Sequence, residues 1–341
     1  MNKWHSLLLA VVVLLLSACG SSGTGEALRE TTVPTTTAQT TQAAPALRLT
    51  IACTQPEDSL PGQGAAAFAQ KLEELSDGNL TCTLLSGGTM GTDAEVTALL
   101  QAGKCDLSPL PAASLTALCP ELEVLGLPFL FESYQEAREM LDGDGGRTLT
   151  EQLPASGVHC LGWMTTGFRQ VTANRAITTP ADFEGLAIHT QPDTLHQAVF
   201  QALGAVPTAV LDDELYDALD QGAVDGQEDT YQSISGKELS RVQSHVMETN
   251  HVLELSILVM SDAVYRNLTD QQRAWVEQAA AYASDVEWTA AMEENETAKQ
   301  ACIENGMTAI TLGRQSLVDA AGSVYDAYRE QYGELMRLFN R

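Results

Sequence analysis

Two neighbouring stretches in the middle of this 341-residue chain decide its fold: GFRQVTANRAITTPADFEGLAIHTQ at 167–191 and ALGAVPTAVLDDELYDALDQGAVDGQED at 202–229. Their apolar periodicity predicts two strands and two helices, with a turn at Gly204. The strands are expected over 167–173 and 186–190, and the helices over 195–203 and 214–219. This alternation of strands and helices predicts an α/β lobe whose sheet is covered by helices.

The N-terminal part of the folded region shows the same alternation. Apolar and polar residues alternate in strand fashion over 47–53, 80–85 and 105–110, and helical spacing occupies 62–75 and 93–102. A βαβαβ order of this kind predicts a parallel sheet. Two further strands are expected over 158–164 and 252–259. Two α/β lobes account for these elements better than one.

A long helix is expected over 270–304, ending at Asn305-Gly306. Its apolar side chains fall near one stripe, which we expect to face the core: Trp275, Ala279, Tyr282, Val286 and Met292.

The two central stretches resemble the signature region of the dicarboxylate-type solute-binding proteins of TRAP transporters, the tripartite ATP-independent periplasmic transporters. The resemblance runs from about 47 to 306 and has supporting motifs in the family's order. These are PEDSLPGQGAAAFAQKLEELSDGNL at 56–80, GGTMGTDAEV at 87–96, LGLPFLFESYQEA at 125–137 and LTDQQRAW at 268–275. It implies a type II-like periplasmic-binding-protein clamshell with hinge strands and a long helix spanning both lobes. The implied lobes are 46–166 plus 255–294, and 167–254 plus 295–341.

The resemblance also implies a receptor that closes on a small solute and delivers it to the membrane subunits of a TRAP permease. We expect a monomer that needs no cofactor and is not an enzyme. An alternative is a binding protein that presents its ligand to a membrane sensor kinase, because both roles use the same fold. An exported hydrolase is the weakest alternative, since no GxSxG motif occurs.

Relatives clamp a substrate carboxylate with two arginines, and this sequence matches only the first of them. Arg169 fills that position, where its guanidinium can meet a carboxylate with two hydrogen bonds. His189 stands where relatives have the second arginine, and its charge is uncertain near neutrality. We therefore expect one carboxylate anchor to be weakened or lost.

Acidic residues occur at further positions of the implied site. Asp229 replaces the amide of the family's DGQEN segment, Asp212 stands where a relative has an aromatic residue, and Glu254 lies on the strand that enters the hinge. Several acids around one arginine would repel a carboxylate ligand. We therefore expect a zwitterionic, amine-bearing or polyol solute, although an organic acid is the family default.

Other predicted ligand contacts are aromatic or polar. Trp163 and Phe168 flank the start of the second lobe and would stack on an apolar or cationic part of the ligand, unless they belong to the core. Gln55 and Gln191 follow predicted strands and are polar contacts by position.

The N-terminus predicts export and lipid anchoring. Residues 1–18 read as a lipoprotein signal peptide, because the apolar run at 7–16 is too short to span a membrane. The sequence LSACG that follows resembles a bacterial lipobox, so Cys19 is the expected lipidation site. Residues 19–45 have the composition of a flexible Thr/Ser-rich tether. We expect the protein on the outer face of the bacterial cell membrane.

Charge and cysteine content narrow the partners. The chain has 45 acidic and 18 basic residues, a formal net charge of −27, which disfavours nucleic acid as a partner. Six cysteines remain besides Cys19, and the sequence leaves open whether they form disulfides. No metal site is expected, because His245 and His251 do not share a helical face and are expected to be solvated.

Overall fold

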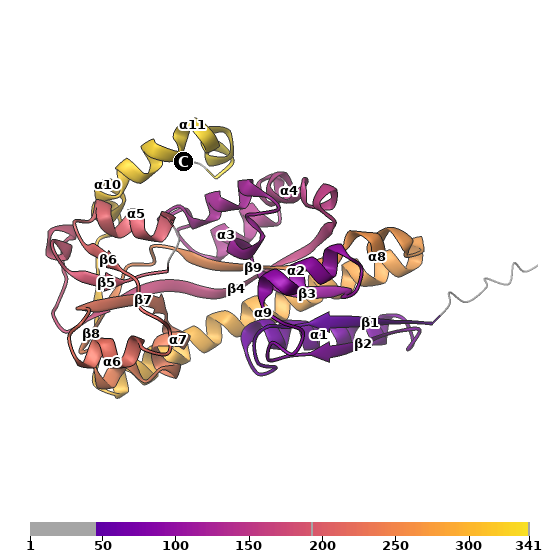
Figure 1. Cartoon of the computed structure of the whole chain (residues 1–341), viewed down its shortest axis with the longest axis horizontal. Coiled ribbons are helices and arrows are strands. Elements are labelled where there is room, and N and C mark those ends of the chain that lie inside the picture. Colours follow the sequence, from indigo (N-terminus) through magenta and orange to yellow (C-terminus); the bar gives the residue numbers. More distant parts are fainter. Residues whose placement is uncertain (1–45, 192–193, 340–341) are drawn as a thin grey trace, which may run out of the picture. The chain divides into compact units, whose positions relative to one another are not determined.

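The computed structural model describes residues 46–191 and 194–339. Strands and helices alternate along most of this part of the chain (Figure 1). The strands are β1 (Leu47–Ala52), β2 (Leu80–Leu85), β3 (Leu107–Pro111), β4 (Val158–Ala173), β5 (Ala187–His189), β6 (Val206–Thr208), β7 (Gly226–Thr230), β8 (His245–Glu248), β9 (Leu253–Ser261) and β10 (Thr308–Thr311).

The helices connect these strands and cover them. The α-helices are α1 (Leu60–Leu75), α2 (Asp93–Gln101), α3 (Tyr134–Leu141), α4 (Asp144–Thr150), α5 (Thr194–Ala202), α6 (Leu215–Asp220), α7 (Tyr231–Gly236), α8 (Asp262–Asn267), α9 (Asp270–Glu304), α10 (Arg314–Ala320) and α11 (Gly322–Leu338). Short 3₁₀ helices are η1 (Ala112–Leu115), η2 (Pro120–Gly126), η3 (Leu153–Ser156), η4 (Pro180–Phe183) and η5 (Leu239–Arg241).

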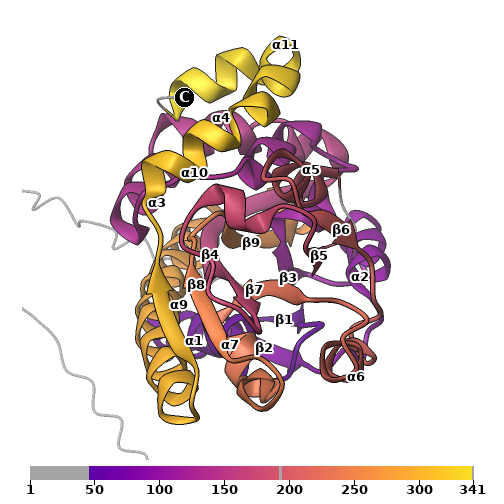
Figure 2. The same cartoon turned by 90° about the vertical axis from the view of Figure 1, so that its left-hand side faces the viewer.

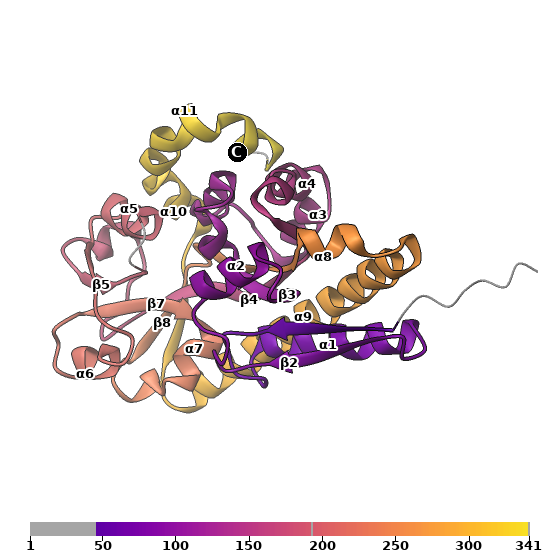
Figure 3. The same ribbon diagram turned by 45° about the vertical axis from the view of Figure 1, so that its right-hand side comes forward.

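The strands in the described residues form one sheet with the order β2-β1-β3-β9-β4-β7-β5-β6, and β8 and β10 lie off this path. β1 pairs in parallel with β2 and β3, which confirms the parallel sheet predicted from the βαβαβ order. β5 pairs in parallel with β6 and β7 at the other end. The antiparallel strands β9 and β4 lie between these two parallel groups (Figure 1). Figure 3 shows β4 between β3 on one side and β7 on the other. They are the strands that connect the two halves of the fold.

β4 is one 16-residue strand, although the sequence indicated two strands with a break between them. The pairing of β4 with β9 shifts register between Thr165 and Gly167, which is a β-bulge. Gly167 has φ of +113°, and a Cβ there would lie 2.5 Å from the amide nitrogen of Asn295. The bulge therefore requires a glycine at position 167. In the sequence this glycine suggested the end of a strand, but the strand continues through the bulge.

The long helix α9 spans Asp270–Glu304 as predicted and begins with a capping box between Thr269 and Gln272. The predicted apolar stripe is wrong in part, because Tyr282 and Met292 are 45% and 42% exposed. Ala279 is buried as predicted. The other buried small side chains of this helix, which contacts α1 and β4, lie outside the stripe: Ala280, Ala283 and Ala291. Close packing therefore selects alanines over the larger apolar residues.

The C-terminal helices were not predicted. α11 packs against η2, α4 and α5 (Figure 2). Its Val324, Tyr332 and Met336 belong to the same core cluster as Leu122 and Leu125 of η2. The C-terminal helix thus contacts elements that are far apart in the sequence.

Two further findings concern the described residues only. None of their helices combines the length and apolarity needed to cross a membrane. Their six cysteines are all free thiols, which answers the question that the sequence left open. The predicted signal peptide, Cys19 and the tether at 19–45 lie outside the described residues.

Candidate functional site

A polar cavity of about 270 Å³ opens where the ends of β1 and β3 approach β4, β7 and β9. It contains five of the predicted ligand contacts. The residues lining it are Thr54, Gln55, Ser59, Leu60, Pro61, Pro109, Pro111, Thr166, Arg169, Gln191, Asp229, Thr230, Gln232, Ser233, Glu254 and Ser256. The carboxyl ends of parallel strands are a usual place for ligands in α/β proteins.

Arg169 is the centre of this cavity's charge network, and its side chain is only 3% exposed. β4 pairs with β7, which brings the side chain beside Glu228 and Asp229. Nε donates to the carboxylate of Glu228, and Nη2 donates to the Glu228 carbonyl oxygen at 2.8 Å. Nη1 donates to the carboxylate of Glu254 and lies 3.4 Å from Asp229 Oδ1. Three carboxylates therefore surround one guanidinium.

These carboxylates fix the ionisation of the arginine and of its buried partner. Burial alone would lower the pKa of Arg169, but Glu228, Glu254 and Asp229 outweigh it and hold that pKa well above its ordinary value. Burial would raise the pKa of Glu228, yet the adjacent Arg169 and a hydrogen bond from His251 hold it well below its ordinary value. Both groups are charged at neutral pH.

His251 completes this network, and the expectation that it is solvated is wrong. It is 2% exposed, its Nε2 lies 3.2 Å from Glu228 Oε2, and its Nδ1 lies 2.8 Å from the hydroxyl of Thr249. Burial lowers the pKa of His251, although Glu228 opposes this. An ionised carboxylate only accepts hydrogen bonds, so a neutral imidazole with its proton on Nε2 fits the contacts.

Asp229 is joined to a second, more exposed pair of charges. It accepts a hydrogen bond from the hydroxyl of Ser233 and lies 3.5 Å from Lys237 Nζ. Lys237 also pairs with Asp212, whose side chain is 77% exposed. Asp212 is therefore a solvated partner of a lysine and is absent from the cavity's lining. In the whole network, four carboxylates stand against Arg169 and Lys237.

His189 lies on β5 and does not line the cavity. Its Nδ1 accepts a hydrogen bond from the backbone N–H of Val210 at 3.2 Å. Burial lowers the pKa of His189, and the opposing effect of the Glu228 carboxylate is smaller. A neutral imidazole with one nitrogen already occupied cannot act as a fixed cation.

The two predicted aromatic contacts are buried in a core cluster. Trp163 is 4% and Phe168 7% exposed, and neither lines the polar cavity. The carbonyl oxygen of Trp163 accepts a hydrogen bond from Trp288 Nε1 at 2.9 Å, and the ring of Phe168 packs edge-on against Tyr134 at 5.0 Å. The structure thus places them as core residues, which the sequence had left open.

Sequence reasoning missed Glu228 and His251 as parts of the site. Glu228 stands directly before Asp229 in the DGQED segment. Because successive side chains of a strand point to opposite faces, a prediction that placed Asp229 in the cavity did not place Glu228 there. The signal was an acidic residue inside an otherwise buried strand, since such a charge needs a partner.

Among the described residues, no group of three or more His, Cys, Asp or Glu side chains is arranged to hold a metal ion.

Two parallel sheet halves, joined by long crossing strands beside a polar cavity, define a two-lobed solute-binding protein. The family model of bacterial extracellular solute-binding protein, family 7, matches residues 51–334, and the chain belongs to this family.

Two sequence relatives and one solved structure support this family assignment. The C4-dicarboxylate-binding periplasmic protein DctP of Rhodobacter capsulatus is 31% identical over 255 residues, which cover 74% of this chain and 76% of that protein. An uncharacterized protein of Sinorhizobium fredii, y4mM, is 32% identical over 79% of this chain, which spans half of that protein's length. The crystal structure of a TRAP periplasmic solute-binding protein from Ochrobactrum anthropi superposes with a TM-score of 0.84 at 30% identity, covering 87% of this chain and 95% of that one. In that structure the C-terminus is bound in the ligand-binding pocket.

Proposed function

We propose that this receptor captures a small polar solute bearing an amine or several hydroxyl groups, and that it delivers this solute to the membrane subunits of a TRAP permease. The observation that carries the proposal is the environment of Arg169. Its guanidinium is already bonded to Glu228 and Glu254 and is 3.4 Å from Asp229. Arg169 is the only arginine among the described residues that line the cavity, and it is therefore neutralised before a ligand arrives.

A simple dicarboxylate suits this cavity poorly. The Rhodobacter capsulatus relative is named for binding C4-dicarboxylates. Here such a ligand would have to displace Glu254 from Arg169 and would still face Asp229. Two like charges 4 Å apart repel by about 4 kcal/mol at an effective dielectric constant of 20. An ammonium group or hydroxyl groups would instead be attracted by the carboxylates and hydrogen-bonded by Gln55 and Gln191.

Closure between two lobes would retain the solute. We place the lobes at 46–166 plus 255–294 and at 167–254 plus 295–341. Gln55 then comes from the first lobe and Asp229 from the second, although both line one cavity. A ligand that contacts both favours the closed form, because it binds that form more tightly. We further propose that Cys19 carries the lipid anchor and that the receptor catalyses no reaction.

A calorimetric screen tests the ligand class. Ethanolamine, glycine and erythritol represent amine, zwitterionic and polyol ligands, and succinate and malate represent dicarboxylates. At least one of the first three should bind, and the dicarboxylates should bind at least about tenfold more weakly, a difference of roughly 1.4 kcal/mol. Tight binding of succinate or malate without binding of the other three would overturn the proposal.

Substitutions then locate the site. Arg169→Ala should weaken binding by about tenfold or more, because it removes the guanidinium that holds Glu228, Glu254 and Asp229 in place around the cavity. Asp229→Asn is the milder variant, since it restores the amide of the family motif and should weaken amine binding while improving succinate binding. Arg175→Ala is the matched control, because Arg175 is exposed and absent from the cavity's lining. Unchanged affinity in both site variants would show that the solute binds elsewhere.

A further inference from the structure

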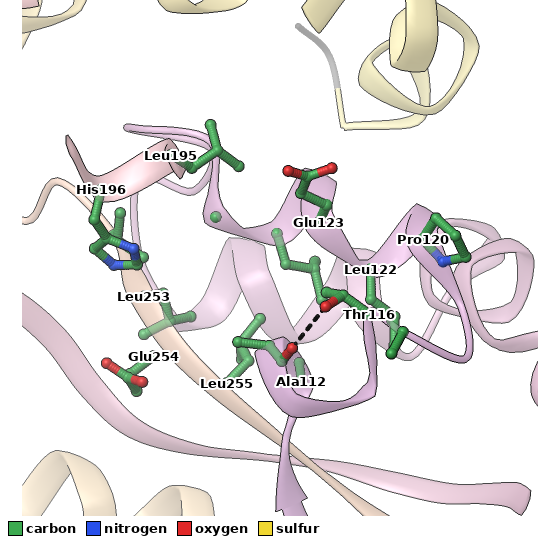
Figure 4. A pocket seen from close by; sticks show the side chains of 15 residues that line it. Ala112, Thr116, Pro120, Leu122, Glu123, Leu195, His196, Leu253, Glu254 and Leu255 are labelled. Atoms are coloured by element: carbon green, nitrogen blue, oxygen red, sulfur yellow. Dashed lines mark hydrogen bonds between the residues drawn. The ribbon is translucent and has the colours of Figure 1, made fainter. Parts of the chain in front are cut away.

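A second, mainly apolar cavity of about 440 Å³ adjoins the polar one at Glu254, which lines both. Its walls come from η1, η2, α5 and the start of β9 (Figure 4). Leucines from three of these elements line it: Leu122, Leu125, Leu195, Leu253 and Leu255. Its size is that of a small-molecule site.

Apart from the imidazole of His196, the ionisable side chains that line this apolar cavity are acidic. Among its described lining residues there is no lysine or arginine, while Glu123 and Glu254 contribute carboxylates. Glu123 lies across the cavity from Glu254 (Figure 4). The Oε2 atom of Glu123 accepts a hydrogen bond from the hydroxyl of Tyr332 at 2.7 Å. The Oε2 atom of Glu254 accepts a hydrogen bond from Arg169, but a third of the Glu254 side chain stays exposed. The Glu254 carboxylate can therefore accept a hydrogen bond from a ligand as well.

We propose that Glu254 and this apolar cavity form a subsite for a primary amine that carries an apolar group. The ammonium lies at Glu254, at the border of the two cavities, and the apolar group lies between Leu122, Leu195 and Leu253. This inference rests on the proposed function, because it assigns the rest of the same ligand. It also makes Glu254 a residue that determines specificity: by occupying Arg169 it excludes a ligand carboxylate and supplies a counter-ion for a cation.

Three probes separate charge from apolar contact. Phenethylamine carries both features, 3-phenylpropionate carries the apolar group with the opposite charge, and ethanolamine carries the amine alone. Calorimetry should show phenethylamine binding at least about tenfold tighter than either of the other two. Glu254→Gln should abolish this preference for the amine over 3-phenylpropionate, because it removes the counter-ion and frees Nη1 of Arg169.

Cavity-filling variants test where the apolar group lies. Ala113 and Ala117 line the apolar cavity and are exposed, so Ala113→Leu and Ala117→Leu fill space without disturbing the core. Each should weaken phenethylamine by at least about fivefold and leave ethanolamine unchanged. Ala281→Leu, at an exposed position of α9, is the matched control. These variants also decide the question if Glu254→Gln does not fold.

The outcomes distinguish this inference from the proposed function. If ethanolamine binds as tightly as phenethylamine, and the leucine variants change neither, the apolar subsite is wrong but the polar amine site stands. If 3-phenylpropionate binds more tightly than phenethylamine, the role of Glu254 is wrong. If neither amine binds at about 10 mM, the inference is wrong, while binding of glycine or erythritol would still support the proposed function.

Discussion

His189 is a position where the charge preference proposed for this receptor can be tested with one side chain. Its Nδ1 is held by the backbone N–H of Val210, and burial lowers its pKa, so it contributes no fixed positive charge. An arginine at the same place would keep its charge and would add a fork of donors. β5 pairs His189 with Gln227, next to the buried Glu228, so the position is within the field of the Arg169 network.

His189→Arg should therefore gain affinity for succinate by about tenfold, because a second cation offsets part of the excess acidity around Arg169. Calorimetric titration of the variant and the wild type with succinate measures the change. His245→Arg is the matched control, since that half-buried histidine lies on β8 and lines neither cavity. Equal gains in both variants would mean that net charge, and not the position of residue 189, governs binding.

Five of the nine predicted ligand contacts line the polar cavity, but the contacts among them were not predicted. Gln55, Arg169, Gln191, Asp229 and Glu254 all line the polar cavity. The pairing of Arg169 with Glu228 and Glu254 was not predictable, because these residues lie 59 and 85 positions away on other strands. Only the register of β4 with β7 and β9 brings them together.

Helix α9 contacts β4 at the bulge through a buried acid. Glu287 is fully buried, and its two carboxylate oxygens accept the Thr165 backbone N–H at 3.1 and 3.0 Å. Burial raises the pKa of Glu287 to about 8, and Glu294 adds to the effect, while the Thr165 N–H and Arg138 oppose it. In the unfolded chain the pKa would return to about 4.5. Between about pH 4.5 and 8, Glu287 therefore holds a proton in the folded state and loses it when the chain unfolds.

It follows that the contribution of Glu287 to stability is complete below about pH 4.5 and is lost as the pH rises towards 8. Within this window the free energy of unfolding should fall by up to about 1.4 kcal/mol per pH unit from this group alone. Glu287→Gln cannot ionise, so its stability relative to wild type should increase from pH 5 to 8 and then level off. Chemical denaturation at several pH values measures this, with exposed Glu293→Gln as the control. Parallel pH profiles for wild type and Glu287→Gln would show that Glu287 does not titrate in this range.

At the level of elements, the sequence predicted those with strong periodicity. β2 and α9 have the predicted bounds, and α2 differs by one residue at its end. α3, α10 and α11 were not predicted, since their buried residues are few and are held by tertiary contacts such as those of α11 with η2. The break expected in β4 was wrong because Gly167 relieves a bulge and does not end the strand.

The whole molecule carries far more negative than positive charge. One-to-one pairing with the 18 basic residues would leave most of the 45 acidic residues without a basic partner. Several of the pairs that do form lie on exposed helix surfaces, such as Arg147 with Asp144 and Arg329 with Asp326. Such pairs contribute about 0–1 kcal/mol each. Repulsion among the remaining acids opposes the compact state over longer distances.

Added salt should therefore stabilise this protein, because screening weakens the repulsion more than it weakens the few exposed ion pairs. The Tm at pH 7 should rise between about 20 and 300 mM NaCl, by roughly 2–4 °C for each kcal/mol of repulsion removed. Scanning calorimetry of the ligand-free protein measures the shift. Near pH 4.3, the isoelectric point of the sequence, the net charge vanishes and the same salt step should change the Tm much less. A Tm that falls with salt at pH 7 would mean that local ion pairs outweigh the net charge of −27.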